Sequence, residues 1–308
     1  MREPVQITTE PTFLEGPVWC DGPGPSGGSL VVTDVALGAL HRVDVDAGTT
    51  RKIADTLGGA NGSTPCADGG FLVTQNGGLD FEALNMFDDP PPVTRVRSGI
   101  QRVSPDGAVT YLTPEPMQAP NDLVVDADGT LYFTDPPPYP LPSDAVGRVM
   151  ALHRDGTLRV VADRLFYPNG IGIEADGTVV IVENGQQQGR SDFGLVRLRA
   201  DGNHERFLDR TGDGFCYDTD GRLYLAGGIH GITVVERDGT VVEELRLPGQ
   251  GVTTNCCFGG PDGRILYATE AMPGGVWAWE GMPTPGRPVV AWPGLLDGSF
   301  GDGAGPGG

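Results

Sequence analysis

Six side chains that carry oxygen ligands recur along the chain at similar intervals. They are separated by 46, 60, 48, 44 and 42 residues, and each opens a stretch of alternating apolar and polar residues that ends in a glycine-rich turn. The six are Glu15, Asn61, Asn121, Asn169, Asp213 and Asn255. Carboxylates gathered in one place repel one another unless a cation neutralises them. Because carboxylate and amide oxygens select hard cations, we expect Ca²⁺, Mg²⁺ or Mn²⁺ there, although a borderline ion such as Zn²⁺ can also occupy oxygen sites.

The same residues have a simpler interpretation as turn formers. Asn and Asp before glycine bond to the local backbone and tolerate left-handed conformations. This explains any single copy, but it does not explain six copies in phase or the glutamate of the first copy, EGPVW at 15–19. A cation held by two carboxylates and a few neutral oxygens keeps positions open for water and substrate, which is typical of a catalytic site.

The repeated unit around these residues predicts an all-β fold. Each unit contains a hairpin signal such as the DG turn of NDLVVDADGTLYFTD, and most units continue into a third and a fourth strand. Four strands in about 45 residues describe one propeller blade. Six units predict a six-bladed β-propeller with four-stranded antiparallel blades around a central metal site, in one domain over 1–297. VQITTE (5–10) is expected to pair with the last blade, and the glycine-rich tail 298–308 is expected to be disordered.

Chain direction in a propeller predicts where a substrate would bind. The first strand of every blade runs beside the central channel, and the loop between the second and third strands returns to the end where the first strand starts. The loops 75–99 and 135–147 should therefore cover the cation, with 184–192 and 227–231 completing the rim. The expected substrate contacts are Asn61, Asn76, Asn121, Asp135, Tyr139 and His230.

Composition limits the class of partner. The net charge of −20 opposes binding to nucleic acid or to an anionic membrane and favours a small molecule or a cation. No apolar run is long enough for a membrane helix or a signal peptide, so we expect a cytoplasmic protein. Five cysteines without CxxC spacing are expected to be buried, inert thiols. The oligomeric state stays open.

The repeats resemble those of the senescence marker protein/gluconolactonase family, which includes regucalcin, and more distantly the phosphotriesterase that hydrolyses diisopropyl fluorophosphate. The resemblance rests on EGPVW (15–19), VTQNGG (73–78), PNDLVVDADGTLYFTDPP (120–137), PNGIGIEADGT (168–178), DGFCYDTDGRLYLA (213–226) and CCFGG (256–260). It implies a lactone hydrolase whose divalent ion is held by Glu15, Asn169 and Asp213, with Asn121 as fourth ligand or substrate contact. It also implies that Asp213 is the general base.

One position departs from the family pattern. Animal members carry an arginine two residues before the asparagine that matches Asn121, and this chain has Ala119 there. Lactone hydrolysis is the leading hypothesis. Because the arginine is absent, the substrate need not be a sugar lactone. Phosphotriester cleavage or another conversion at the same site, and a propeller that binds calcium or a ligand without catalysis, are the alternatives.

Overall fold

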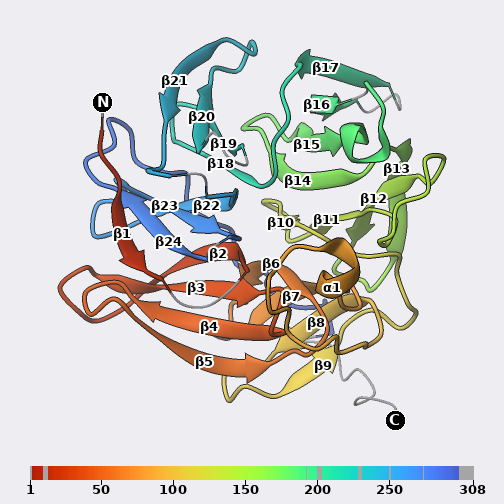
Figure 1. Ribbon diagram of the computed structural model, residues 1–308, viewed down its shortest axis with the longest axis horizontal. Helices are drawn as coiled ribbons and strands as arrows, with labels where there is room; N and C mark the ends of the chain where they lie inside the picture. The colour runs from red at the N-terminus through yellow and green to blue at the C-terminus, as the bar shows by residue number, and fades with distance from the viewer. Residues whose placement is uncertain are drawn as a thin grey trace.

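The fold was obtained as a computed structural model, which describes residues 2–9, 13–191, 193–199, 203–227, 231–249, 251–272 and 274–297. Six four-stranded antiparallel sheets surround a central axis (Figure 1). The predicted all-β, six-bladed propeller is confirmed. The only helical segments in the described residues are α1 (Phe81–Leu84) and the 3₁₀ turn η1 (Gly185–Gln188). None of the described helices is long and apolar enough to cross a membrane.

Each of the first five blades is built from four consecutive strands, numbered from the channel outward. The blades are β2 (Leu14–Asp21), β3 (Gly28–Asp34), β4 (Ala39–Asp44) and β5 (Thr49–Asp55); β6 (Ala60–Pro65), β7 (Phe71–Gln75), β8 (Gly99–Val103) and β9 (Val109–Tyr111); β10 (Leu123–Val125), β11 (Leu131–Asp135), β12 (Gly147–Leu152) and β13 (Leu158–Leu165); β14 (Pro168–Ile173), β15 (Val179–Asn184), β16 (Phe193–Leu198) and β17 (His204–Leu208); and β18 (Phe215–Tyr217), β19 (Leu223–Ala226), β20 (Ile232–Val235) and β21 (Val241–Leu245).

The sixth blade closes the ring with the N-terminus of the chain. Its inner strands are β22 (Thr253–Gly259), β23 (Ile265–Glu270) and β24 (Gly275–Trp279), and its outermost strand is β1 (Val5–Thr8). Val5 lies opposite Ala278 and Thr8 opposite Val276 in an antiparallel pair. This confirms the closing strand expected at 5–10. Joining the two ends of the chain in one sheet ties the first blade to the last, so the ring closes without a gap.

The sequence explains the hairpins and the core. Gly129, Gly177 and Gly221 follow Asp in the turns after β10, β14 and β18, with φ values of 88°, 86° and 89° that favour glycine. The core is divided into layers between neighbouring sheets. In one layer, for example, Val180 and Val182 of the fourth blade pack with Leu225 of the fifth. These layers hold the blades at fixed positions around the axis.

The cysteines and the chain end were also part of the sequence predictions. All five thiols are free, with Cys66, Cys256 and Cys257 buried and Cys20 and Cys216 half-buried. Burial raises the pKa of Cys66 to about 12, as expected for an unreactive thiol. The tail 298–308 lies outside the described residues.

Candidate active site at one end of the channel

Five of the six repeat residues line one cavity of about 450 Å³ at the end of the channel where the first strands begin. We call it the first cavity. Its lining includes Glu15, Asn61, Asn121, Asn169 and Asp213, which come from five different blades. Glu15 and the three asparagines are buried, and Asp213 is partly exposed. Residues that recur at the same position of five repeats thus meet in one cavity.

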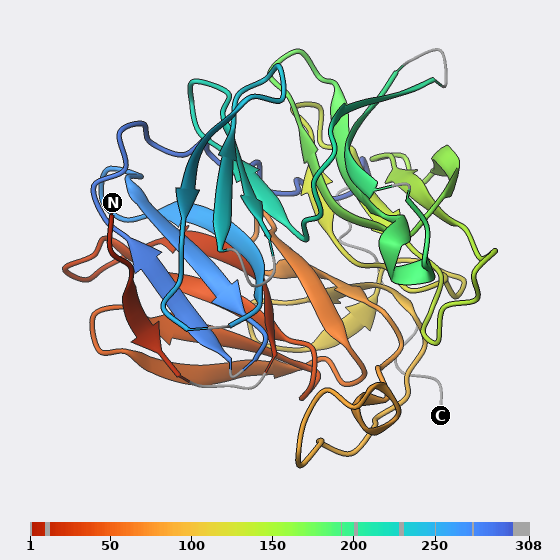
Figure 2. The ribbon, with the colours of Figure 1, turned by 45° about the horizontal axis from the view of Figure 1, so that its top comes forward.

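Two long loops form the outer wall of this cavity. Residues 76–79, 84, 86, 95, 96 and 98 contribute from the loop between β7 and β8, and 137–139 from the loop between β11 and β12. Figure 2 shows the first loop, which carries α1 in orange, projecting beyond the sheets. Asn76 and Tyr139 both line the cavity. The Tyr139 ring packs edge-on against Tyr167, with centroids 5.6 Å apart.

The other expected rim segments differ from these loops. Residues 184–191, the described part of 184–192, contribute nothing to the lining of the first cavity. His230 lies outside the described residues.

Asp135 lies behind the cavity wall rather than on it. Its fully buried carboxylate accepts hydrogen bonds from the Ala119 amide at 3.0 Å and from Arg148 Nε at 2.8 Å. The matching residues of two other blades make the same kind of bond: Gln75 accepts from the Gly59 amide at 2.6 Å, and Glu183 from the Phe166 amide at 2.8 Å. In each blade the bond fixes the chain two or three residues before the repeat residue. Asp135 therefore fixes the backbone before Asn121 and does not line the first cavity.

Threonines near the ends of second strands hold the repeat residues of neighbouring blades. The sequences VTD, VTQ and FTD at the ends of β3, β7 and β11 were not recognised as part of the site. In each case the buried threonine hydroxyl donates to the backbone carbonyl of the repeat residue in the next blade. The pairs are Thr33 with Asn61, Thr74 with Asn121, and Thr134 with Asn169, the last at 2.6 Å.

A third carboxylate lies under the first cavity. Asp122 is buried, and Asn255 Nδ2 donates to both of its oxygens, at 3.1 and 3.0 Å. The same nitrogen donates to Glu15 Oε2 at 3.2 Å. Asn255, the sixth repeat residue, therefore does not line the first cavity; it joins two carboxylates from below. The sequence signal for Asp122 was its position directly after a repeat asparagine.

The carboxylates and amide oxygens of the first cavity have little positive charge and few hydrogen-bond donors near them. Burial, and then the charges of Asp213 and Asp122, raise the pKa of Glu15 well above its ordinary value. Burial and the charge of Asp122 raise the pKa of Asp213 in the same direction. The side-chain oxygens of Asn61, Asn121 and Asn169 are buried and have no hydrogen-bond partner in the described part of the chain. Buried acceptors without donors and carboxylates without counter-ions fit a hard cation.

The donor set determines what kind of cation site this could be. The described residues contain no group of three or more His, Cys, Asp and Glu side chains placed to hold a metal ion. A cation here would need the amide oxygens as well as the carboxylates. Such an all-oxygen set favours hard divalent ions over a metal that prefers thiolate or imidazole ligands, and a borderline ion such as Zn²⁺ can also occupy it.

A family model named SMP-30/Gluconolactonase/LRE-like region matches residues 13–272, which is most of the chain. The chain belongs to this family. Among curated proteins, a pentonolactonase of Haloferax volcanii is 29% identical to this chain, over 86% of this chain and 84% of that protein. A gluconolactonase of Zymomonas mobilis is 27% identical to this chain, over 86% of this chain and 78% of that protein. Both matches extend over nearly the whole propeller.

Solved structures agree on the architecture. The family member superposes on a gluconolactonase from Xanthomonas campestris with a TM-score of 0.70 and 24% identity, over 92% of this chain and 89% of the other. This likeness concerns the fold.

Proposed function

We propose that this protein hydrolyses a lactone at the first cavity, using a divalent cation held by Glu15, Asn121, Asn169 and Asp213, with Ca²⁺ expected first. The observation that carries the proposal is the meeting of unpartnered amide oxygens and mutually destabilised carboxylates from different blades. The lactonase relatives support the reaction type. A bound cation would supply positive charge for the oxygen of the substrate carbonyl.

The roles of the protein's own residues follow from their positions. Asp213 would accept a proton from the water that attacks the lactone carbonyl carbon, and would return it to the ring oxygen as the ring C–O bond breaks. Asn61 and Asn121 would orient the substrate beside it. The product is the open hydroxy acid, and no further reactant is needed.

The cavity wall supports a substrate with an apolar substituent. Ala119 lines the cavity at the position where animal members carry arginine. The two loops bring the apolar residues Leu79, Leu84, Met86, Val96, Pro137 and Pro138 to the lining, together with Arg95 and Ser98, and Phe13 and Met272 add to the apolar part from elsewhere. Asn76 and Tyr139 would provide polar contacts to the substrate on this wall. Apolar lining with a few polar groups suits a ring that carries an alkyl or aryl group.

The proposal is tested with a pH-indicator assay on metal-stripped protein to which Ca²⁺, Mg²⁺, Mn²⁺ or Zn²⁺ is restored in turn. The substrates are an alkyl-substituted lactone, gluconolactone and an aryl phosphotriester. Asp213→Asn is compared with Asp209→Asn, which changes a carboxylate that is 81% exposed. Cation binding is measured separately by calorimetry, so that binding and turnover are distinguished.

We expect metal-dependent lactone turnover that falls at least about 10²-fold in Asp213→Asn and is unchanged in Asp209→Asn. Full activity in Asp213→Asn would refute its role as base. Faster turnover of gluconolactone would contradict the apolar substituent but not the reaction. Phosphotriester turnover alone, or cation binding without any turnover, would overturn the lactonase proposal in favour of one of the two alternatives.

A further inference from the structure

A second cavity of about 560 Å³ occupies the opposite end of the channel. Its lining includes the turns after β10 and β14, which lie at the far ends of those strands from the first cavity. The two cavities are separated at Glu15, Asp122 and Asn255, since Glu15 lines the first and the other two line the second. Nothing in the proposed hydrolysis uses this second cavity.

The segment 286–292 crosses this end of the channel as a strap. Arg287 N donates to Tyr217 O of the fifth blade at 2.9 Å, and Trp292 N donates to Pro65 O of the second blade at 2.7 Å. Between these two anchors, Val289 and Val290 line the cavity and are 52% and 40% exposed. The strap is therefore fixed at both ends and leaves the cavity open to solvent beside its middle.

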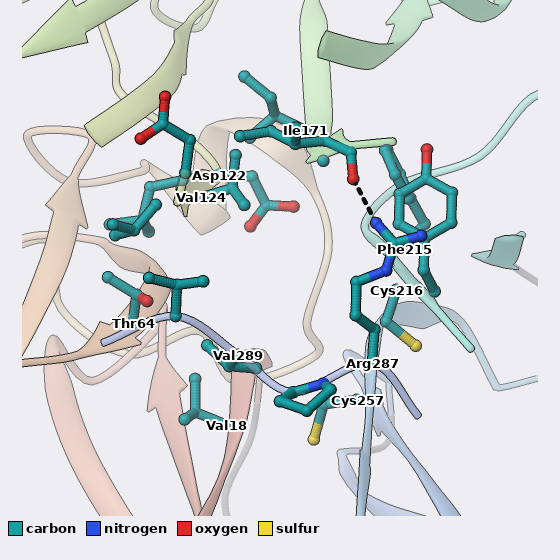
Figure 3. A pocket seen from close by; sticks show the side chains of 18 of the residues that line it. Val18, Thr64, Asp122, Val124, Ile171, Phe215, Cys216, Cys257, Arg287 and Val289 are labelled. Carbon is teal, nitrogen blue, oxygen red and sulfur yellow. Dashed lines mark hydrogen bonds between the residues drawn. The ribbon is translucent and has the colours of Figure 1, made fainter. Parts of the chain in front are cut away.

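The wall beneath the strap is mainly apolar. Figure 3 shows Val18, Val124, Ile171, Phe215 and Val289 arranged around the open space. An apolar cavity of this size falls in the range of roughly 300–1,000 Å³ that is usual for small-molecule sites. The wall therefore suits the hydrocarbon part of a ligand.

Arg287 gives this apolar cavity one positive charge. Its Nη1 donates to Ile173 O at 2.6 Å, and its guanidinium carbon lies 4.7 Å from the centre of the Tyr217 ring (Figure 3). No carboxylate of the described residues forms an ion pair with it. The acidic neighbour Glu174 is already engaged, at 2.8 Å by Arg197 and at 3.0 Å by Arg237. Among the described residues the Arg287 side chain donates only to Ile173 O, so most of its guanidinium N–H groups stay available to an anion.

We propose that the second cavity binds a monocarboxylate with an apolar chain, its carboxylate on Arg287 and its chain between the strap and the wall. One guanidinium matches one carboxylate in a two-point contact. A multiply charged anion is disfavoured, because the protein carries a net charge of −20 and four carboxylates, Asp122, Asp126, Asp128 and Glu174, also line the cavity. The proposal is independent of the proposed hydrolysis, which takes place at the other end of the channel.

Calorimetric titration with decanoate tests the proposal, with decanol as the uncharged probe and butanoate as the short one. Arg287→Gln is compared with Arg246→Gln, which removes the same charge from a side chain that is 70% exposed. We expect decanoate to bind more tightly than either other probe, and Arg287→Gln alone to weaken it about tenfold. Equal affinity in both variants, or no binding of decanoate to the unmodified protein, would overturn the proposal.

Photo-crosslinking locates the bound probe on the unmodified protein. It therefore tests the proposed site even if Arg287→Gln fails to fold. A decanoate analogue with a diazirine on its chain is irradiated with the unmodified protein, and the labelled peptides are identified by mass spectrometry. Attachment at 171–173, 215–217 or 287–290 is expected. Attachment at 76–98 or 137–139 would place the chain in the first cavity and refute the assignment.

Discussion

Replacing Thr134 by valine tests whether the threonines hold the site together. The Thr134 hydroxyl is fully buried, donates to Asn169 O at 2.6 Å and accepts from the Asp122 amide at 3.1 Å. Valine keeps nearly the same shape but leaves both backbone groups without this partner. At about 1–3 kcal/mol for each unsatisfied buried group, the free energy of unfolding should fall by roughly 2–6 kcal/mol.

The same substitution should affect cation binding beyond its effect on stability. Asn169 and Asp122 lie in and directly below the proposed cation site, so loss of their anchor loosens the donor geometry. Loss of an outer hydrogen bond of this kind typically costs about 10–100-fold in metal affinity. Calorimetric titration of metal-stripped protein with Ca²⁺, together with urea unfolding, measures both effects.

Thr113→Val is the matched control. Thr113 is 1% exposed, and its hydroxyl oxygen accepts from the Ile100 amide at 3.1 Å in the outer part of the second blade. It should lower stability by roughly 1–3 kcal/mol and leave Ca²⁺ affinity unchanged. If both variants lose affinity in proportion to stability, or if Thr134→Val binds Ca²⁺ like the unmodified protein, then the threonine does not preorganise the site.

Two further predictions concern packing and pH. Gly16→Ala should unfold at a much lower temperature than Gly189→Ala in thermal melts. Both glycines have a left-handed φ, 48° and 73°, but an added Cβ at Gly16 would lie 2.5 Å from Asn61 O, whereas a Cβ at Gly189 would meet open space. Equal losses of thermal stability in the two variants would mean that φ alone determines the cost. Burial raises the pKa of Glu270 above 4.5, despite a bond from Trp277 Nε1 at 3.0 Å. The folded state therefore holds this proton more tightly than the unfolded state, and stability falls as pH rises above about 4.5 towards the raised pKa. Urea unfolding at pH 5 and pH 7.5 should show a smaller fall in Glu270→Gln; an identical fall would exclude this carboxyl as its source.

The sequence was sufficient for the features that depend on local pattern. The DG turns after β10, β14 and β18 and the alternation around them predicted the hairpins, and their repetition predicted the blades. The phase of the repeat then placed Glu15, Asn61 and Asp213 at one end of the channel. In a repeated fold, residues at the same position of each repeat occupy equivalent places around the axis. Residues far apart in the sequence could therefore be assigned to the same end of the channel.

Features that depend on side-chain contacts between segments far apart in the sequence were beyond this reasoning. Asp135 accepts a bond from the backbone just before the first strand of its own blade, and Thr134 reaches Asn169 of the next blade at 35 residues' separation. Neither contact has a signature in the local sequence pattern. Asp135 was expected on the wall because it begins the loop 135–147. Its partners, Ala119 and Arg148, could be identified only once the strands of its own blade were paired.

Asn255 explains why the sixth position of the repeat carries an amide. The repeat residues Glu15 and Asn121 line the first cavity, whereas the residues that follow them, Gly16 and Asp122, line the second. The floor between the cavities thus contains carboxylates from two blades. An amide at 255 donates to both, while an aspartate there would remove the donor and add a further negative charge. The sixth residue therefore supplies a hydrogen-bond donor to the floor carboxylates without adding negative charge, while the other five repeat residues line the first cavity.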